Sequence, residues 1–300
     1  MVTKPYFTQG TPKMTVEVTR RSRSLPRTDS TTSGEMAPKR RSGNRAKTRV
    51  PIRKAEKLAA KQSPIDITKD IVDYDRKLRA SALKLKYTIS DTDRVEVSDH
   101  GFTCWMKDGC SSVLNGSHLK GPYQLIQFHA HWGKNRKCGS EHLLEGRQFA
   151  GELHCVFWNK KYGSFEKATQ HCDGCTVLAI FLAEGKEDHK GFKPIVDAIE
   201  VARQKHDKAN VSKEFDLSAL LPDKLSYYTY QGSLTTPPYT ECIIWTILRR
   251  PIKLSKSQLN ILREITTDNF RSPQLLNKRR VRSSFILIGK QEKEGSESSK

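Results

Sequence analysis

Residues 125–133 of this chain are Leu-Ile-Gln-Phe-His-Ala-His-Trp-Gly, and residues 152–158 are Glu-Leu-His-Cys-Val-Phe-Trp. Both stretches are rich in β-branched and aromatic residues, which predicts two β-strands. Side chains two positions apart on a strand point to the same face, so His129 and His131 project together. The glycine-containing loop between the stretches allows the two strands to pair and to bring His154 to that same face.

Three histidines on one face predict a zinc site whose fourth coordination position is open. An open position is typical of catalytic zinc, because the metal lowers the pKa of a bound water from ~15.7 to near ~7. A His-x-His pair alone is more often a surface feature, so His129 and His131 do not establish metal binding by themselves. Glu152 strengthens the prediction, since it lies two residues before His154 on the same face and can hold an imidazole N–H.

Other hydrophobic patterns predict the fold class. Residues 177–182 and 242–248 are short apolar runs that indicate buried strands, whereas apolar residues recur at helical spacing between Phe192 and Ala202. These patterns predict a mainly β fold of the α+β class, with a central sheet and helices at its periphery. The chain has 300 residues, which is long enough for one domain with a large core.

Five stretches follow one another in an order that is distinctive of one enzyme family. They are residues 62–67 (Gln-Ser-Pro-Ile-Asp-Ile), 128–133, 139–142 (Gly-Ser-Glu-His), 152–159 and 230–238 (Tyr-Gln-Gly-Ser-Leu-Thr-Thr-Pro-Pro). On these motifs, about three quarters of the chain resembles an α-class carbonic anhydrase. The resemblance implies a monomer with one catalytic domain, placed here at residues 62–289. It also implies a large twisted mixed central β-sheet of about ten strands, with short peripheral helices.

The resemblance assigns the metal site and the proton path residue by residue. His129, His131 and His154 match the Zn²⁺ ligands. His100 matches a proton shuttle, a role that suits histidine because its ordinary pKa is near ~6.5. Thr235 matches a residue whose hydroxyl accepts a hydrogen bond from zinc-bound hydroxide and donates one to a carboxylate, here Glu141. The second shell that orients the three histidines consists of Gln127, Glu152 and Asn269.

The resemblance also implies the substrate and the reaction. Carbon dioxide is small and uncharged, so it needs an apolar wall beside the metal rather than a charged anchor. The residues matching this substrate-binding region are Val156, Val177, Leu234, Thr235, Thr236 and Trp245. The implied function is reversible hydration of carbon dioxide to bicarbonate and a proton, by zinc-hydroxide attack and histidine proton shuttling. The alternative is a catalytically impaired binding module of the same family with an anion-binding basic tail; the complete set of three histidines, Glu141 and Thr235 favours the enzyme.

The chain departs from the family pattern in two regions near the site. Residues 1–61 contain no tryptophan, whereas the family normally carries an aromatic N-terminal segment with a Trp-Gly element. Ser98 and Thr103 replace asparagines that often flank the shuttle. These differences affect the water network, so we expect them to alter proton transfer more than hydration itself.

Residues 1–61 form a basic segment of different composition from the rest. They hold 16 Lys and Arg against 4 acidic residues, a net charge of +12 out of +20 for the whole chain. This composition predicts a disordered, solvated tail, and residues 290–300 form a second, polar tail. A non-functional extension, a weak contact with nucleic acid or an anionic membrane surface, a nuclear address and a mitochondrial transit peptide all remain open for the basic tail.

The seven cysteines bear on the cellular compartment. Their number is odd, and the chain opens without a secretory apolar segment and contains no run of the ~18 apolar residues that a transmembrane helix needs. The cysteine pair that secreted family members use for a disulfide is absent here, so the chain resembles the intracellular branch, and we predict a cytoplasmic protein. Cys172 and Cys175 form an isolated Cys-x-x-Cys, which we interpret as two free thiols.

Overall fold

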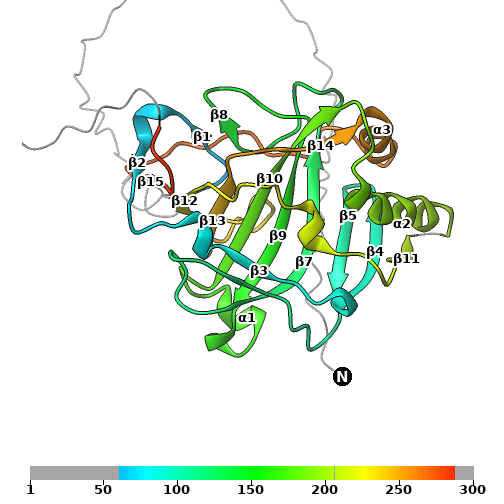
Figure 1. Ribbon diagram of the computed structural model, residues 1–300, viewed down its shortest axis with the longest axis horizontal. Coiled ribbons are helices and arrows are strands. Elements are labelled where there is room, and N and C mark those ends of the chain that lie inside the picture. Colours follow the sequence, from blue (N-terminus) through cyan, green and yellow to red (C-terminus); the bar gives the residue numbers. More distant parts are fainter. Residues whose placement is uncertain (1–60, 206, 288–300) are drawn as a thin grey trace, which may run out of the picture. The chain divides into compact units, whose positions relative to one another are not determined.

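The two histidine-bearing stretches form neighbouring antiparallel strands near the middle of a large β-sheet (Figure 1). A computed structural model describes residues 61–205 and 207–287. Strand β7 spans Tyr123–Trp132 and β9 spans Gly151–Asn159. In their register His129 lies opposite His154, which confirms the predicted pairing of the two strands.

Thirteen strands make up the main sheet in the described part of the chain, and ten of them form a continuous path. The path runs in the order β11-β4-β5-β7-β9-β10-β13-β12-β15-β2. Besides β7 and β9, its members are β11 (Lys208–Asn210), β4 (Thr92–Ser98), β5 (Gly101–Met106), β10 (Cys175–Gly185), β13 (Ile243–Leu248), β12 (Tyr227–Gly232), β15 (Val281–Ser283) and β2 (Val72–Tyr74).

The sheet is mixed, as predicted, because β10 runs parallel to β13 and β15 runs parallel to β2 among otherwise antiparallel neighbours on the path. It exceeds the expected ten strands because three short ones attach beside the path: β3 (Lys84–Lys86), β6 (Val113–Asn115) and β14 (Ile252–Ser255). Strands of three or four residues are too short to give a period-two pattern in the sequence. A separate parallel pair joins β1 (Asp66–Ile67) to β8 (Leu143–Leu144).

Helices are short and lie around the sheet (Figure 1). The α-helices are α1 (Phe165–Ala168), α2 (Lys193–Gln204) and α3 (Lys256–Arg263), and the 3₁₀ turns span Lys69–Ile71, Ala80–Ala82, Ile89–Asp91, Lys160–Tyr162, Lys190–Phe192 and Leu217–Leu220. Helix α2 contains most of the predicted helical pattern; its buried residues include Ile195 and Ile199, and it packs against β4 and β11. A mainly β fold of the α+β class is confirmed.

A β-bulge in β7 places Leu125 on the core face of the sheet and the histidines of the same strand on the other face. The register with β9 shifts between Leu125 and Gln127, so Leu125 points into the hydrophobic core although it is an even number of residues from His129. A bulge inserts one residue and reverses the alternation of side chains beyond it. Phe128 and Leu153 join the same core cluster, and the three histidines are left on the opposite face of the sheet.

The predicted tails lie outside the described residues, apart from Lys61 at the end of the basic segment. The proposed domain limits at residues 62 and 289 therefore remain predictions. None of the helices in the described part of the chain combines the length and apolar character that a membrane crossing requires. All seven cysteines are free, including Cys172 and Cys175 at the turn that enters β10.

Candidate metal centre

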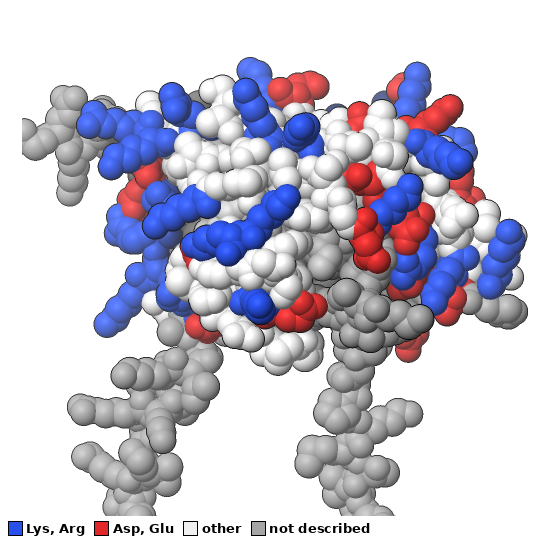
Figure 2. All heavy atoms as spheres, turned by 90° about the horizontal axis from the view of Figure 1, so that it is seen from below, with Lys and Arg blue, Asp and Glu red and all other residues white. Residues whose placement is uncertain are grey.

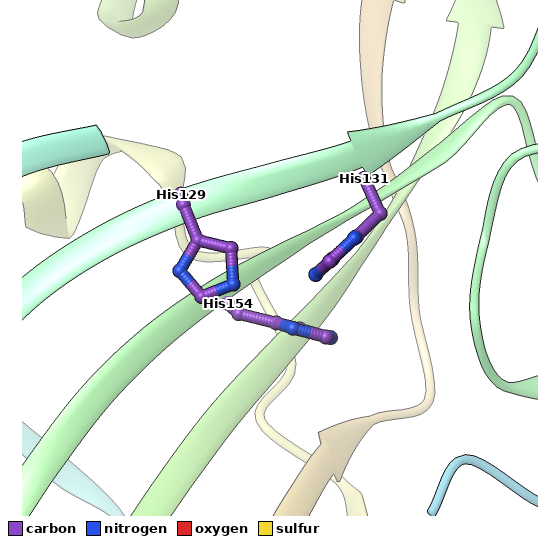
Figure 3. Close-up of side chains that lie close together, drawn as sticks. All are labelled: His129, His131 and His154. Carbon is purple, nitrogen blue, oxygen red and sulfur yellow. The ribbon is translucent and has the colours of Figure 1, made fainter. Parts of the chain in front are cut away.

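Three imidazole rings from β7 and β9 converge on one point (Figure 3). The ring centroids of His129 and His131 are 5.1 Å apart, and those of His131 and His154 are 4.8 Å apart. One nitrogen from each ring lies within 4.8 Å of the others, and His131 and His154 are almost fully buried. The predicted grouping of the three side chains is therefore present in the structure.

In each of these histidines, the ring nitrogen that faces away from the other two rings contacts an oxygen atom of a neighbouring residue. Gln127 Oε1 lies 2.9 Å from Nδ1 of His129, and Glu152 Oε1 lies 2.8 Å from Nε2 of His154. The backbone carbonyl of Asn269 lies 2.8 Å from Nδ1 of His131. An acceptor at these distances requires the ring nitrogen to carry the proton, so the other nitrogen of each ring keeps a free lone pair.

The free nitrogens fit zinc. Nε2 of His131 is buried and has no hydrogen-bond partner among the described residues. Burial, together with the neighbouring His131 and His154, holds the pKa of His129 well below its usual value, and burial also lowers the pKa of His154. Neutral imidazoles with converging lone pairs are the donor set of a three-histidine zinc site.

Glu152 also belongs to a buried hydrogen-bond network that the sequence analysis did not assign. Its Oε1 lies 2.7 Å from Nδ1 of His142, whose Nε2 lies 2.7 Å from the hydroxyl of Tyr230. Burial alone would raise the pKa of Glu152, but His142 and His154 hold it well below its usual value. The only sequence signal for His142 is its position directly after Glu141 in the 139–142 motif.

His142, Glu152 and His154 are close enough to form a second candidate metal group, but hydrogen bonds explain their contacts better. Two ligands of one tetrahedral zinc, each ~2.0–2.1 Å from the metal, lie about 3.3 Å apart. The contacts of Glu152 with the two histidines are 2.7 and 2.8 Å. We therefore assign this group as the support of His154.

Glu141 lies beside His131 and His154, and both Glu141 and Thr235 are buried. Oε1 of Glu141 accepts a hydrogen bond of 2.9 Å from the backbone N–H of Arg271, and Oε2 has no partner among the described residues. Oε2 lies 3.9 Å from Nδ1 of His154. Among the described residues no hydrogen bond joins Thr235 to Glu141, so their predicted pairing is not formed here, although one carboxylate oxygen is free to accept it.

The predicted apolar wall lies on the same face as the histidines. Val156, Val177 and Trp245 are direct cross-strand neighbours on β9, β10 and β13, and all three are buried. The ring of Trp245 lies 5.0 Å from that of His154, which places this row beside the histidines. Leu234 and Thr236 are half-buried, in the segment that follows β12.

His100 lies with Asp99 in the two-residue turn between β4 and β5. Its side chain is 44% exposed, and Nε2 is 3.5 Å from a carboxylate oxygen of Asp99. The side-chain amide of Asn269 donates to the carbonyl of His100, while the backbone carbonyl of Asn269 holds His131. Asn269 therefore links the turn to the metal centre, and the shuttle candidate has the solvent access that proton release needs.

Comparison with known proteins agrees with this geometry. Residues 52–285 match the family model of the eukaryotic-type carbonic anhydrases. Carbonic anhydrase 7 of Mus musculus is 39% identical over 238 residues, which cover 75% of this chain and 89% of the relative. Carbonic anhydrase 3 of Homo sapiens is 38% identical over 239 residues, with the same two coverages of 75% and 89%. This chain therefore belongs to the eukaryotic-type carbonic anhydrase family.

Proposed function

We propose that this protein is a zinc enzyme that interconverts carbon dioxide and bicarbonate. The observation that carries the proposal is the orientation of the three histidines, each held through one ring nitrogen and free at the other. The family membership supports the same reaction. When bound, zinc would lower the pKa of a water ligand toward ~7 and so supply a nucleophile at neutral pH.

In this proposal, the three histidines hold the metal and their hydrogen-bond partners fix the ring tautomers. Gln127, Glu152 and the backbone of Asn269 accept the outer N–H groups, which keeps the inner nitrogens unprotonated. The hydrogen bond between Glu152 and His142 in turn fixes the position of the Glu152 carboxylate. The chain thereby holds the ligand set in position before the metal arrives.

The remaining residues are proposed to position the substrate and the attacking oxygen. The row of Val156, Val177 and Trp245 supplies an apolar surface on which carbon dioxide can lie without competing hydrogen bonds. Leu234 and Thr236 complete this surface from the segment after β12. The hydroxyl of Thr235, when it donates to the free Oε2 of Glu141, has only its lone pairs left for the attacking water. It would therefore accept a hydrogen bond from that water, which turns an oxygen lone pair of the water toward the substrate.

Removal of the metal tests the proposal. We expect stopped-flow measurements to detect carbon dioxide hydration by the full chain, and we expect a chelator such as dipicolinate to abolish it. Returning one equivalent of zinc, but not magnesium, should restore the rate, because imidazole nitrogens suit zinc and magnesium prefers oxygen ligands. A zinc-loaded chain that does not hydrate carbon dioxide would contradict the enzyme and favour a binding module.

Replacement of His100 tests the proton path. In dilute buffer we expect His100→Ala to lower the maximal hydration rate about tenfold or more, since a positioned proton acceptor is replaced by bulk water. Added imidazole buffer should restore most of the loss, because a diffusible base can take the proton. His171→Ala, at another exposed histidine, is the matched control and should behave like the parent. Equal rates for His100→Ala and the parent in dilute buffer would exclude His100 as the shuttle.

The cytoplasmic location, the monomeric state and a contact of residues 1–61 with nucleic acid or an anionic surface are further parts of the proposal. The strongest argument for an anionic partner is the net charge of +12 in that segment. Such binding is independent of catalysis and would weaken steeply with added salt.

A further inference from the structure

A basic cleft lies on the sheet face opposite the three histidines. Its volume is about 690 Å³, and its lining includes Lys61, Lys120, Lys278, Arg279, Arg280 and Arg282. Figure 2 shows Lys and Arg side chains gathered on the side of the molecule where β2, β12 and β15 lie in Figure 1. The volume is within the range of small-molecule sites, about 300–1,000 Å³.

Strand register places the cleft on this face. Thr229 of β12 lies opposite Thr246 of β13 on one side and Arg282 of β15 on the other, so the three side chains share one face of the sheet. Trp245, the neighbour of Thr246, points to the other face, where its ring packs against His154. The cleft therefore does not contain the three histidines, although Tyr230, which lines it, also contacts His142 in the network behind His154.

The floor of the cleft contains polar atoms without partners. Thr229 is 1% exposed, and its hydroxyl has no hydrogen-bond partner among the described residues. Nδ1 of His118 is likewise unpartnered, while Nε2 lies 2.7 Å from the hydroxyl of Thr246. Burial, with a contribution from Arg282, lowers the pKa of His118 to about 3, so the ring is neutral. When Thr246 donates to Nε2, Nδ1 of His118 carries the proton and lies against Gly116, so the hydroxyl of Thr229 is the donor that stays available in the cleft.

Several positive charges at the cleft are not neutralised by the protein. Arg280 and Arg282 pair with Asp73 and Asp75. In contrast, Lys61, Lys120, Lys278 and Arg279 have no carboxylate within ion-pair distance among the described residues.

The side chains of the two less exposed cations, Lys61 and Arg279, hydrogen-bond only to neutral groups, and Glu241 is a nearby carboxylate whose charge acts on Arg279. The ammonium of Lys61 contacts the amide of Gln231, and the guanidinium of Arg279 donates to backbone carbonyls and lies 5.3 Å from the ring centre of Tyr230. Burial lowers the pKa of Arg279, which reflects the cost of holding this charge away from water.

The single acidic residue that lines the cleft does not offset these charges. Asp173 is already occupied by the ammonium of Lys161 at 2.6 Å and by the hydroxyl of Tyr162. An anion that entered the cleft would therefore meet four cations that have no ion-pair partner among the described residues at its walls, and the unused hydroxyl of Thr229 at its floor. Hydrogen bonds between charged partners are roughly twice as strong as hydrogen bonds between neutral groups.

We propose that this cleft is a second ligand site that binds a small soluble phosphate compound carrying two or more negative charges. Multiple charge is required because a monoanion such as bicarbonate would leave most of the cations unpaired. The limited volume favours a small molecule over a polymer. This site is independent of the proposed carbon dioxide chemistry on the other face.

Calorimetric titration of the full chain with pyrophosphate at constant ionic strength tests the site. We expect one saturable site, weakened at least tenfold in the double variant Lys120→Gln/Lys278→Gln. The matched control Lys213→Gln/Lys224→Gln removes the same charge from exposed positions outside the cleft and should bind like the parent. Because all variants keep residues 1–61, a difference between the two double variants reports on the cleft alone.

Two further variants locate the bound anion. Thr229→Val keeps the side-chain shape and removes the hydroxyl, so it should weaken pyrophosphate several-fold while the melting temperature confirms that the protein is folded. His129→Ala removes a candidate metal ligand and should leave pyrophosphate affinity unchanged, which separates this site from the metal centre whether or not the enzyme proposal holds.

Four outcomes would overturn the proposal. They are the absence of saturable pyrophosphate binding, equal weakening in the two double variants, equal affinity of the His129→Ala variant for bicarbonate and pyrophosphate, and loss of pyrophosphate binding in His129→Ala. Vesicles of phosphatidylcholine with phosphatidylinositol bisphosphate form a separate arm: binding to them without binding to soluble pyrophosphate would assign the cleft to a lipid surface and contradict a soluble ligand.

Discussion

Replacing His129 by alanine is expected to remove both zinc and carbon dioxide hydration. The substitution deletes one of three converging nitrogens and leaves Gln127 Oε1 without its partner. Loss of a residue that merely orients a metal ligand costs about 10–100-fold in affinity or activity, so loss of a ligand itself should exceed about 100-fold. Stopped-flow hydration and metal analysis of the purified chain measure the two effects together.

The matched control for this prediction is His171→Ala, which removes an exposed histidine stacked on Tyr162. It should keep both the zinc content and the hydration rate of the parent. Circular dichroism would verify that His129→Ala is folded, since His129 lies on a central strand. A folded His129→Ala chain that retains parental zinc and activity would exclude the proposed ligand set.

Replacing Thr235 by valine is expected to reduce hydration about 100-fold without removing zinc. Valine has nearly the same shape as threonine but cannot donate to the free Oε2 of Glu141 or accept from the attacking water. The water would then sample orientations that do not face the substrate. Because the three histidines are untouched, zinc content should remain one per chain, and the change should appear in the hydration rate alone.

Thr169→Val provides a control of the same chemistry outside the site, where the hydroxyl of Thr169 donates to the carbonyl of Glu166. It should leave hydration unchanged. Glu141→Gln should resemble Thr235→Val if the two residues act as one unit, and the double variant should then lose little more than either single variant. Parental rates in zinc-loaded Thr235→Val would show that the hydroxyl does not orient the reaction.

Local pattern was sufficient to predict the main elements of the fold. Residues 177–182 lie in β10, all but the first of residues 242–248 form β13, and the helical spacing from Phe192 to Ala202 corresponds to α2. These signals are contained in continuous stretches, where hydrophobic periodicity follows directly from the geometry of a strand or a helix. The grouping of the histidines could be predicted for the same reason, because His129 and His131 are two positions apart on one strand and therefore share a face.

Contacts between distant segments could not be predicted from local pattern. Asn269 reaches His131 across 138 positions of sequence, and its role was inferred from family resemblance rather than from the residues around it. The network of His142, Glu152 and Tyr230 is buried and depends on three separate segments. The partners of a buried polar group are set by how the chain packs, and sequence spacing carries little information about that packing.

The amino-acid sequence by itself determined the mainly β character, the three-histidine motif and the family to which the chain belongs. Tertiary structure decided the bulge that turns Leu125 into the core, the free oxygen of Glu141, and the basic cleft that joins Lys61 and Lys120 to the basic residues between positions 278 and 282. The reason is physical: alternation along one strand is a local property, whereas register, burial and charge compensation arise only when segments far apart in the chain come into contact.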